Sequence, residues 1–110
     1  MFMNAIYKNQ SALKIRVVCS KLIDGVLTPL DITGALETKI KYKKPSGATG
    51  SWTAIIENAA QGIIYYDVTT TEVIDESGTW KIWPFIKFSD ARVAPGTPEE
   101  IMVLVEGEAV

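Results

Sequence analysis

Few side chains of this sequence are suited to acid–base or nucleophilic chemistry. The chain has no histidine and one cysteine, Cys19. Histidine is the usual general base, a common metal ligand and the pH switch near neutrality, so its absence removes all three. Cys19 alternates in phase with Ile15 and Val17, and we expect it to face the core with no base to activate it. We therefore expect no catalytic residue, no metal site and no enzyme activity.

Asp75 and Glu76 are the carboxylates that best fit a catalytic pair, because they are adjacent in a segment without a strand pattern. Two carboxylates at a set separation can hydrolyse a glycosidic bond. Nothing in the sequence sets that separation, and aspartate is common in turns, so we expect them to shape a loop. The sequence also has no glycine-rich phosphate loop and no calcium-loop pattern. We expect no cofactor and no small-molecule ligand.

A run of lysines, Lys39, Lys41 and Lys43, is the basic patch of the sequence. The lysines alternate with Ile40 and Tyr42, as on the outer face of a strand. Such lysines commonly keep a strand soluble and protect it against edge pairing. The formal net charge is −2, which does not favour nucleic acid or an anionic membrane as a partner. The lysines remain candidates for a protein contact.

The segment 79–88 is the most aromatic of the chain. Strict alternation places Trp80 and Phe88 inward and leaves Trp83 and Phe85 outward, where they could bind a protein or stack on a sugar. Pro84 lies between them and cannot donate to a sheet ladder, so we expect an edge strand or a bulge there. A bulge would shift the alternation and bury one of the two rings. Both alternatives fit the sequence.

The elements that would position these side chains have a period of two. Strands are predicted over 13–20, 36–43, 51–57, 63–70, 79–88 and 101–105, separated by turn signals such as Asp24-Gly25 and Pro45-Ser46-Gly47. Six or seven short strands without a long helical segment are typical of a sandwich. We predict an all-β, immunoglobulin-like antiparallel β-sandwich of about seven strands. It forms a single domain over 1–110, with short flexible ends at about 1–10 and 106–110.

Two further features bear on partners and location. The segment 101–105 has no polar side chain, so it is buried on both sides or covers another subunit, and we expect a possible homo-oligomer. The N-terminus lacks the basic and apolar regions of a signal peptide, and no apolar stretch reaches the length of a membrane helix. We expect no membrane insertion.

Several short strings, in this order, carry a family resemblance. They are Leu30-Asp31-Ile32-Thr33-Gly34-Ala35, then Lys39 to Gly47, Trp52-Thr53-Ala54, Gly62-Ile63-Ile64-Tyr65-Tyr66, and Ser77-Gly78-Thr79-Trp80. Together they resemble small immunoglobulin-like proteins encoded among tailed-bacteriophage structural genes. They are also similar to the N-terminal domain of the baseplate upper protein family.

The resemblance implies a non-enzymatic structural or assembly protein of a tailed phage or prophage particle, in the tail or baseplate. Its partners would be other phage structural proteins, and it would be made in the bacterial host cytoplasm and located in the virion. The alternative is a carbohydrate-binding or adhesion module that stacks sugars on exposed aromatic side chains.

Overall fold

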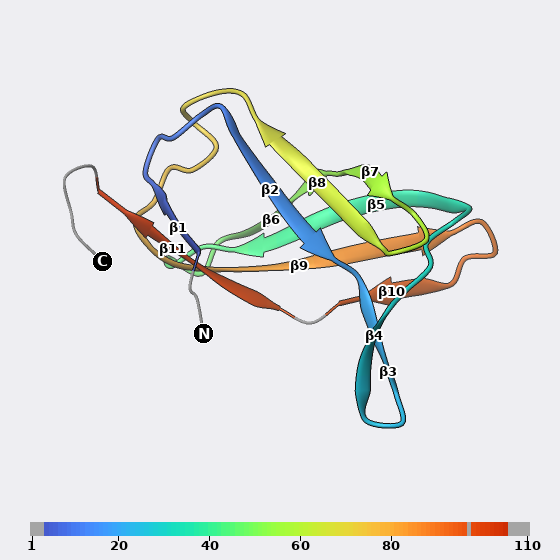
Figure 1. The fold of residues 1–110 in the computed structure, drawn as a ribbon. Helices are drawn as coiled ribbons and strands as arrows, with labels where there is room; N and C mark the ends of the chain where they lie inside the picture. Colours follow the sequence, from blue (N-terminus) through green and yellow to red (C-terminus); the bar gives the residue numbers. More distant parts are fainter. Residues whose placement is uncertain (1–3, 97, 106–110) are drawn as a thin grey trace.

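The computed structural model describes residues 4–96 and 98–105, and these form strands joined by turns and loops (Figure 1). None of the described residues is helical, so this part of the chain has no helix able to cross a bilayer. The strands are β1 (Asn4–Tyr7), β2 (Leu13–Val18), β3 (Ser20–Ile23), β4 (Val26–Pro29), β5 (Ala35–Lys43), β6 (Thr49–Thr53), β7 (Ile55–Asn58), β8 (Ile63–Val68), β9 (Gly78–Phe88), β10 (Val93–Pro95) and β11 (Glu99–Leu104).

Two sheets pack face to face as a β-sandwich, which confirms the predicted immunoglobulin-like fold. The larger sheet has the order β1-β11-β9-β5-β6, with β10 also paired to β9, and the smaller sheet has the order β2-β8-β7. A separate hairpin of β3 and β4 extends from the body (Figure 1). Strand pairing is antiparallel except that β1 runs parallel to β11.

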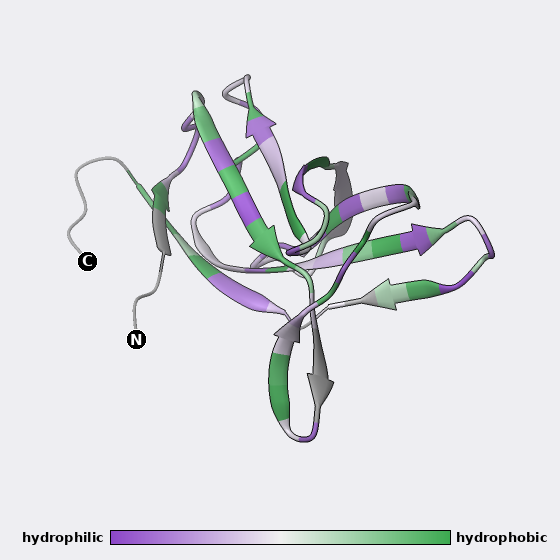
Figure 2. Cartoon of the chain, turned by 45° about the vertical axis from the view of Figure 1, so that its right-hand side comes forward, coloured by the Kyte–Doolittle hydropathy of each residue, from purple (hydrophilic) through white to green (hydrophobic). Residues whose placement is uncertain are grey.

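The core lies between the sheets and is built by residues that alternate along the strands. Figure 2 shows this alternation along β2 as hydrophobic and hydrophilic bands. Ile15 and Val17 point inward from β2, and Ile40 and Ile86 meet them from the larger sheet. Burying an aliphatic side chain contributes roughly 1.5–3 kcal/mol, so this alternation accounts for the pairing of the layers.

The segment 51–57 is two strands and not the single strand predicted. β6 belongs to the larger sheet and β7 to the smaller one. The switch occurs at Ala54, whose N–H donates to the Thr38 carbonyl at 3.0 Å while the Thr38 hydroxyl donates to the Ala54 carbonyl at 2.8 Å. These bonds hold the crossing residue in the core. Unbroken alternation over the predicted strand 51–57 would place Ile56 inward with Trp52 and Ala54, but Ile56 is exposed beyond the switch.

A bulge at the start of β5 corrects a second prediction. Unbroken alternation over the predicted strand 36–43 would place Leu36 on the inner face with Ile40, but Leu36 is 69% exposed. The register of β5 against β9 shifts between Ala35 and Glu37, so one extra residue is inserted and the alternation restarts. Ala35 then packs against the core where Leu36 was expected.

Pro84 causes no bulge and does not lie on an edge, so the prediction for that position is wrong. Pairing of β9 with β5 runs without a shift through Phe85, Pro84 and Trp83, and β9 lies in the middle of the larger sheet. Pro84 is buried, and Trp83 and Phe85 keep the outward phase that strict alternation predicts, each half-buried.

The N-terminal end of the chain is ordered differently from the prediction. Asn4–Tyr7 pairs with Ile101–Leu104 as a strand, where a flexible end was expected over 1–10. Ile101 and Val103 are buried in the core, and Met102 is half-buried, so the apolar run 101–105 is partly explained by burial within the chain. The predicted flexible end at 106–110 lies outside the described residues.

Candidate functional site: the lysine–aromatic face

The structure brings together all five side chains that the sequence singles out for interaction. Strand β5 pairs with β9 so that Lys39 is opposite Phe85 and Lys41 is opposite Trp83. Lys43 follows on the same face, opposite Lys81. The two alternating runs lie far apart in sequence and form one surface because β5 and β9 are neighbours in the larger sheet.

This outer surface of the larger sheet is called the lysine–aromatic face below. Its members share the outward phase of β5 and β9, opposite to the core residues Ile40, Ile82 and Ile86. They are Lys39, Lys41, Lys43, Lys81, Trp83, Phe85 and Lys87. Sequence reasoning missed Lys81 and Lys87, although both share the phase of Trp83 and Phe85.

Contacts within the face hold its lysines in place. The ammonium of Lys41 lies 4.0 Å from the centre of the Phe85 ring, a cation–π contact. The Lys39 Nζ lies 2.7 Å from Glu37 Oε1. The hydrogen bond and charge of Lys39 lower the pKa of Glu37, and the charges of Lys87 and Lys41 act in the same direction. The shift of this pKa is therefore due first to the ion pair with Lys39 and only then to the other lysines of the face.

The face carries more positive charge than the chain as a whole. Its five lysines are accompanied by two carboxylates of the same sheet, Glu37 and Glu100, the latter opposite Lys81. Five positive and two negative charges leave a net of +3 on a chain whose net charge is −2. A hollow of about 460 Å³ opens beside Trp83, between Lys41 and Ser51. The face is therefore more positive than the chain as a whole, and its surface is hollowed beside Trp83.

The other tryptophans belong to the core and are not available to a ligand. Trp52 is 9% exposed and stacks on Tyr66, with ring centres 5.1 Å apart. Trp80 is 1% exposed, and its indole N–H donates to the Glu76 carbonyl at 2.9 Å. Tyr42 completes this cluster against both tryptophans. Sugar stacking on Trp52 is excluded by its burial.

Asp75 and Glu76, considered as a catalytic pair, are engaged in holding a loop. The Lys44 Nζ lies 2.9 Å from Asp75 Oδ1 and 4.0 Å from Glu76 Oε2. Glu76 also accepts hydrogen bonds from the backbone N–H and the hydroxyl of Ser46, at 3.2 and 3.0 Å. The hydrogen bond from Lys44 to Asp75 raises the pKa of the lysine. These contacts connect the β5–β6 turn to the segment before β9.

Cys19 is 2% exposed, and burial raises the pKa of its thiol to about 11. A thiol in this state is not a nucleophile near neutral pH. Among the described residues, no group of three or more His, Cys, Asp or Glu side chains is arranged to hold a metal ion.

Comparison with known proteins supports the fold and contradicts the resemblance to phage proteins. No family model matches the chain, and no curated protein matches its sequence. Its structure is similar to that of CopC from Methylosinus trichosporium OB3b, with a TM-score of 0.54 and 12% identity. The match covers 98% of this chain and 89% of CopC. At this identity the likeness shows the β-sandwich fold alone.

The resemblance to tailed-phage structural proteins is therefore wrong, and so is the tail or baseplate role that it implied. The fold that the chain shares over nearly its whole length is that of a bacterial protein. The strings that carried the resemblance have local structural roles: Asp31 accepts a hydrogen bond from the Thr33 N–H at 2.9 Å in a turn, and Gly78-Thr79-Trp80 begins β9. Such strings mark turns and strand starts, which many sandwiches share.

Proposed function

We propose that this chain is a non-catalytic binding domain that holds an acidic protein surface against its lysine–aromatic face. The observation that carries the proposal is the register of β5 against β9, which joins five lysines and two half-buried aromatic rings on one sheet surface. Flat surfaces with aromatic anchors and charged surroundings are typical of protein interfaces.

Electrostatics favour an acidic partner. The face has a net charge of +3 on an acidic chain, so its field would orient an approaching partner. Each exposed ion pair contributes only about 0.2–1 kcal/mol. Affinity would therefore depend on several lysines acting together and on apolar contact with Trp83 and Phe85.

A single-stranded nucleic acid would use a similar combination of positive charge and aromatic rings. The state of the rings argues against it: Trp83 and Phe85 are half-buried, and Lys41 lies over Phe85. Stacked bases need open ring faces.

The donor atoms of the described residues do not match the ligands that copper prefers. Copper in proteins is held by imidazole, thiolate and thioether ligands. The sequence has no histidine, and its one cysteine is buried in the core. Met102 is half-buried on β11. Among the described residues, the shared fold is thus not accompanied by a ligand set that copper prefers.

The proposal is tested by titrating the full chain with a short poly-glutamate peptide at low salt. We expect saturable binding that weakens about tenfold or more when the ionic strength rises from about 0.01 M to about 0.3 M. The double charge reversal Lys41→Glu with Lys81→Glu should abolish it. The control is the charge reversal Lys8→Glu, at an exposed lysine outside the lysine–aromatic face, which should bind as the wild type does.

Two results would overturn the proposal. One is the absence of binding to poly-glutamate by a wild-type chain that unfolds cooperatively. The other is tighter binding of a single-stranded oligothymidylate of equal charge, which would assign the face to nucleic acid. Trp83→Ala separates the contributions, because it removes the aromatic contact and leaves every charge in place.

A further inference from the structure

The two sheets of the sandwich differ in width, and this leaves one side open. The larger sheet continues from β9 to β11 and β1, whereas the smaller sheet ends at β2. β2 lies over β9, so in the part of the chain that the structure describes no strand of the smaller sheet covers β11 and β1. The free edge of β2 borders this uncovered part of the larger sheet.

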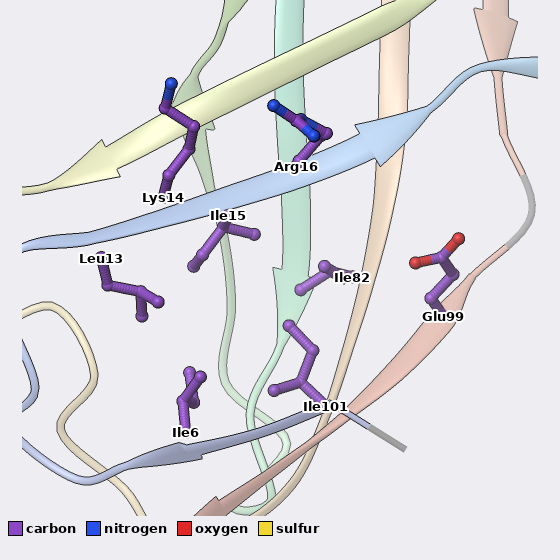
Figure 3. Close-up of a pocket in the computed structure, with 8 residues that line it drawn as sticks. All are labelled: Ile6, Leu13, Lys14, Ile15, Arg16, Ile82, Glu99 and Ile101. Atoms are coloured by element: carbon purple, nitrogen blue, oxygen red, sulfur yellow. The ribbon is translucent and has the colours of Figure 1, made fainter. Parts of the chain in front are cut away.

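A cleft of about 290 Å³ lies along that edge (Figure 3). Leu13 and Ile15 point into it from β2, and Ile82 and Ile101 point into it from the larger sheet. Its walls are aliphatic. Charged groups are confined to the rim, where they are contributed by Lys14, Arg16 and Glu99.

The backbone at this edge is available for pairing. The N–H of Cys19 donates to the Gly62 carbonyl at 2.8 Å and continues the register of β2 against β8. In an antiparallel pair the direction of N–H and C=O alternates along the strand. The odd-numbered residues of β2 therefore bond to β8, and the amide groups of Lys14 and Arg16 point away from it. Within the described residues, these groups have no backbone partner.

We propose that the free edge of β2 binds an extended segment of a partner protein in which apolar and acidic residues alternate. The segment adds a strand to the smaller sheet through the amide groups of Lys14 and Arg16, as in other cases of strand addition. Its apolar side chains enter the cleft over Ile15 and Ile101.

The charges of β2 select the other face of the bound segment. The side chains of Lys14 and Arg16 are exposed on the outer side of the smaller sheet, next to the positions that a neighbouring strand would occupy. Arg16 already pairs with Glu57 at 2.8 Å, and Lys14 is opposite Asp67 of β8, so an acidic segment would share these cations with the carboxylates of the sheet. Opposite charges on adjacent strands are favourable and like charges are not. If β2 paired with β2 of a second copy, Lys14 and Arg16 would lie opposite positive side chains and be repelled. The charges therefore favour an acidic partner over self-pairing.

The test uses the full chain and three labelled peptides of about eight residues. One alternates valine with glutamate, one alternates valine with lysine, and one has the valine–glutamate composition in scrambled order. Fluorescence anisotropy should show that the valine–glutamate peptide binds at least about tenfold more tightly than either of the others. Amide hydrogen exchange should slow at Lys14 and Arg16 on binding. Lys14→Glu with Arg16→Glu should reverse the preference toward the valine–lysine peptide.

Two substitutions at Arg16 separate the contribution of its backbone N–H to binding from that of its side-chain charge. Arg16→Pro removes the outward N–H and the side-chain charge, while Arg16→Ala removes the charge alone. Proline is tolerated at an outward position of an edge strand, and thermal unfolding confirms the fold of both variants. We expect Arg16→Ala to weaken binding a few-fold and Arg16→Pro to abolish it.

The inference is overturned if the scrambled peptide binds equally, if Arg16→Pro binds as Arg16→Ala does, or if exchange slows elsewhere and not along β2. The variant with Lys41→Glu and Lys81→Glu should keep this binding, because both lysines lie on the other sheet. Loss of binding in that variant alone would assign the peptide to the lysine–aromatic face.

Discussion

Gly96 and Pro84 are in contact at the gap between β10 and β11. The Gly96 N–H donates to the Pro84 carbonyl at 2.9 Å, and the proline ring occupies the space that a Cβ at Gly96 would need. The missing N–H of Pro84 points to the same side as its carbonyl, where β11 has ended its pairing at Ile82 and β10 begins at Phe85. Proline is therefore tolerated in a central strand because its position coincides with a break between two partners.

Gly96→Ala should destabilise the fold by about 1–3 kcal/mol, because the new methyl group overlaps the Pro84 ring. The measurement is urea-induced unfolding followed by circular dichroism. In the variant that also carries Pro84→Ala the clash is relieved, so the two costs should not add. Strict additivity of the two substitutions would contradict the contact.

Gly62 is expected to be far less tolerant of alanine than Gly47, although both have a positive φ, +69° and +93°. A Cβ at Gly62 would lie 2.5 Å from the Leu30 carbonyl oxygen and 2.8 Å from that of Cys19, whereas a Cβ at Gly47 meets open space. We expect a loss of about 1–2 kcal/mol for Gly47→Ala from backbone strain alone and at least about 3 kcal/mol for Gly62→Ala. Equal losses in urea unfolding would show that crowding at Gly62 is absent.

The thiol of Cys19 should make stability fall in alkaline solution. Burial raises its pKa from the ordinary value of 9.0 to about 11. Below pH 9 the thiol is neutral in both the folded and the unfolded chain, and its full contribution to the free energy of unfolding is present. As the pH rises from 9 to the folded pKa of about 11, only the unfolded chain ionises, and the free energy of unfolding falls by roughly 2–3 kcal/mol. Unfolding free energies of wild type and Cys19→Ala, measured in parallel, should converge over this range. Parallel curves would contradict the burial of an ionisable thiol.

Glu37→Gln should strengthen the binding of poly-glutamate. The substitution removes a carboxylate from the lysine–aromatic face and releases Lys39 from its ion pair. We expect an increase in affinity of about two- to fivefold at low salt. Glu72→Gln is the control, since Glu72 is exposed between β8 and β9 and lies outside both surfaces, and its affinity should not change. A weaker complex for Glu37→Gln would count against an acidic ligand.

Local alternation predicted much of the sandwich, because a strand with one buried face shows its period directly in the sequence. The runs that became β2, β5, β8 and β9 were all recognised, and the Asp24-Gly25 turn has positive φ at both residues, 51° and 79°, as a two-residue hairpin needs. Alternation did not reveal the change of sheet at Ala54, because the hydrogen bonds to Thr38 that hold it are non-local. The bulge before Glu37 depends equally on the partner strand.

The candidate site shows the same division. Alternation within each strand predicted that Lys39 and Lys41 share one face and that Trp83 and Phe85 share another. These two faces form one surface because β5 and β9 are neighbours in the larger sheet, and they join residues more than forty positions apart. Alternation within a strand does not predict which strands are neighbours. The open edge of β2 was hidden for the same reason, because it depends on the different widths of the two sheets.

Amide chemical-shift mapping of the wild-type chain with poly-glutamate tests the central claim most directly. The account predicts that the shifted resonances cluster at Lys39–Lys43 on β5 and at Lys81–Lys87 on β9. Added salt should release the peptide and restore the chemical shifts of the free chain. Shifts confined to β2 and β8 of the smaller sheet, or the absence of any saturable shift, would contradict it.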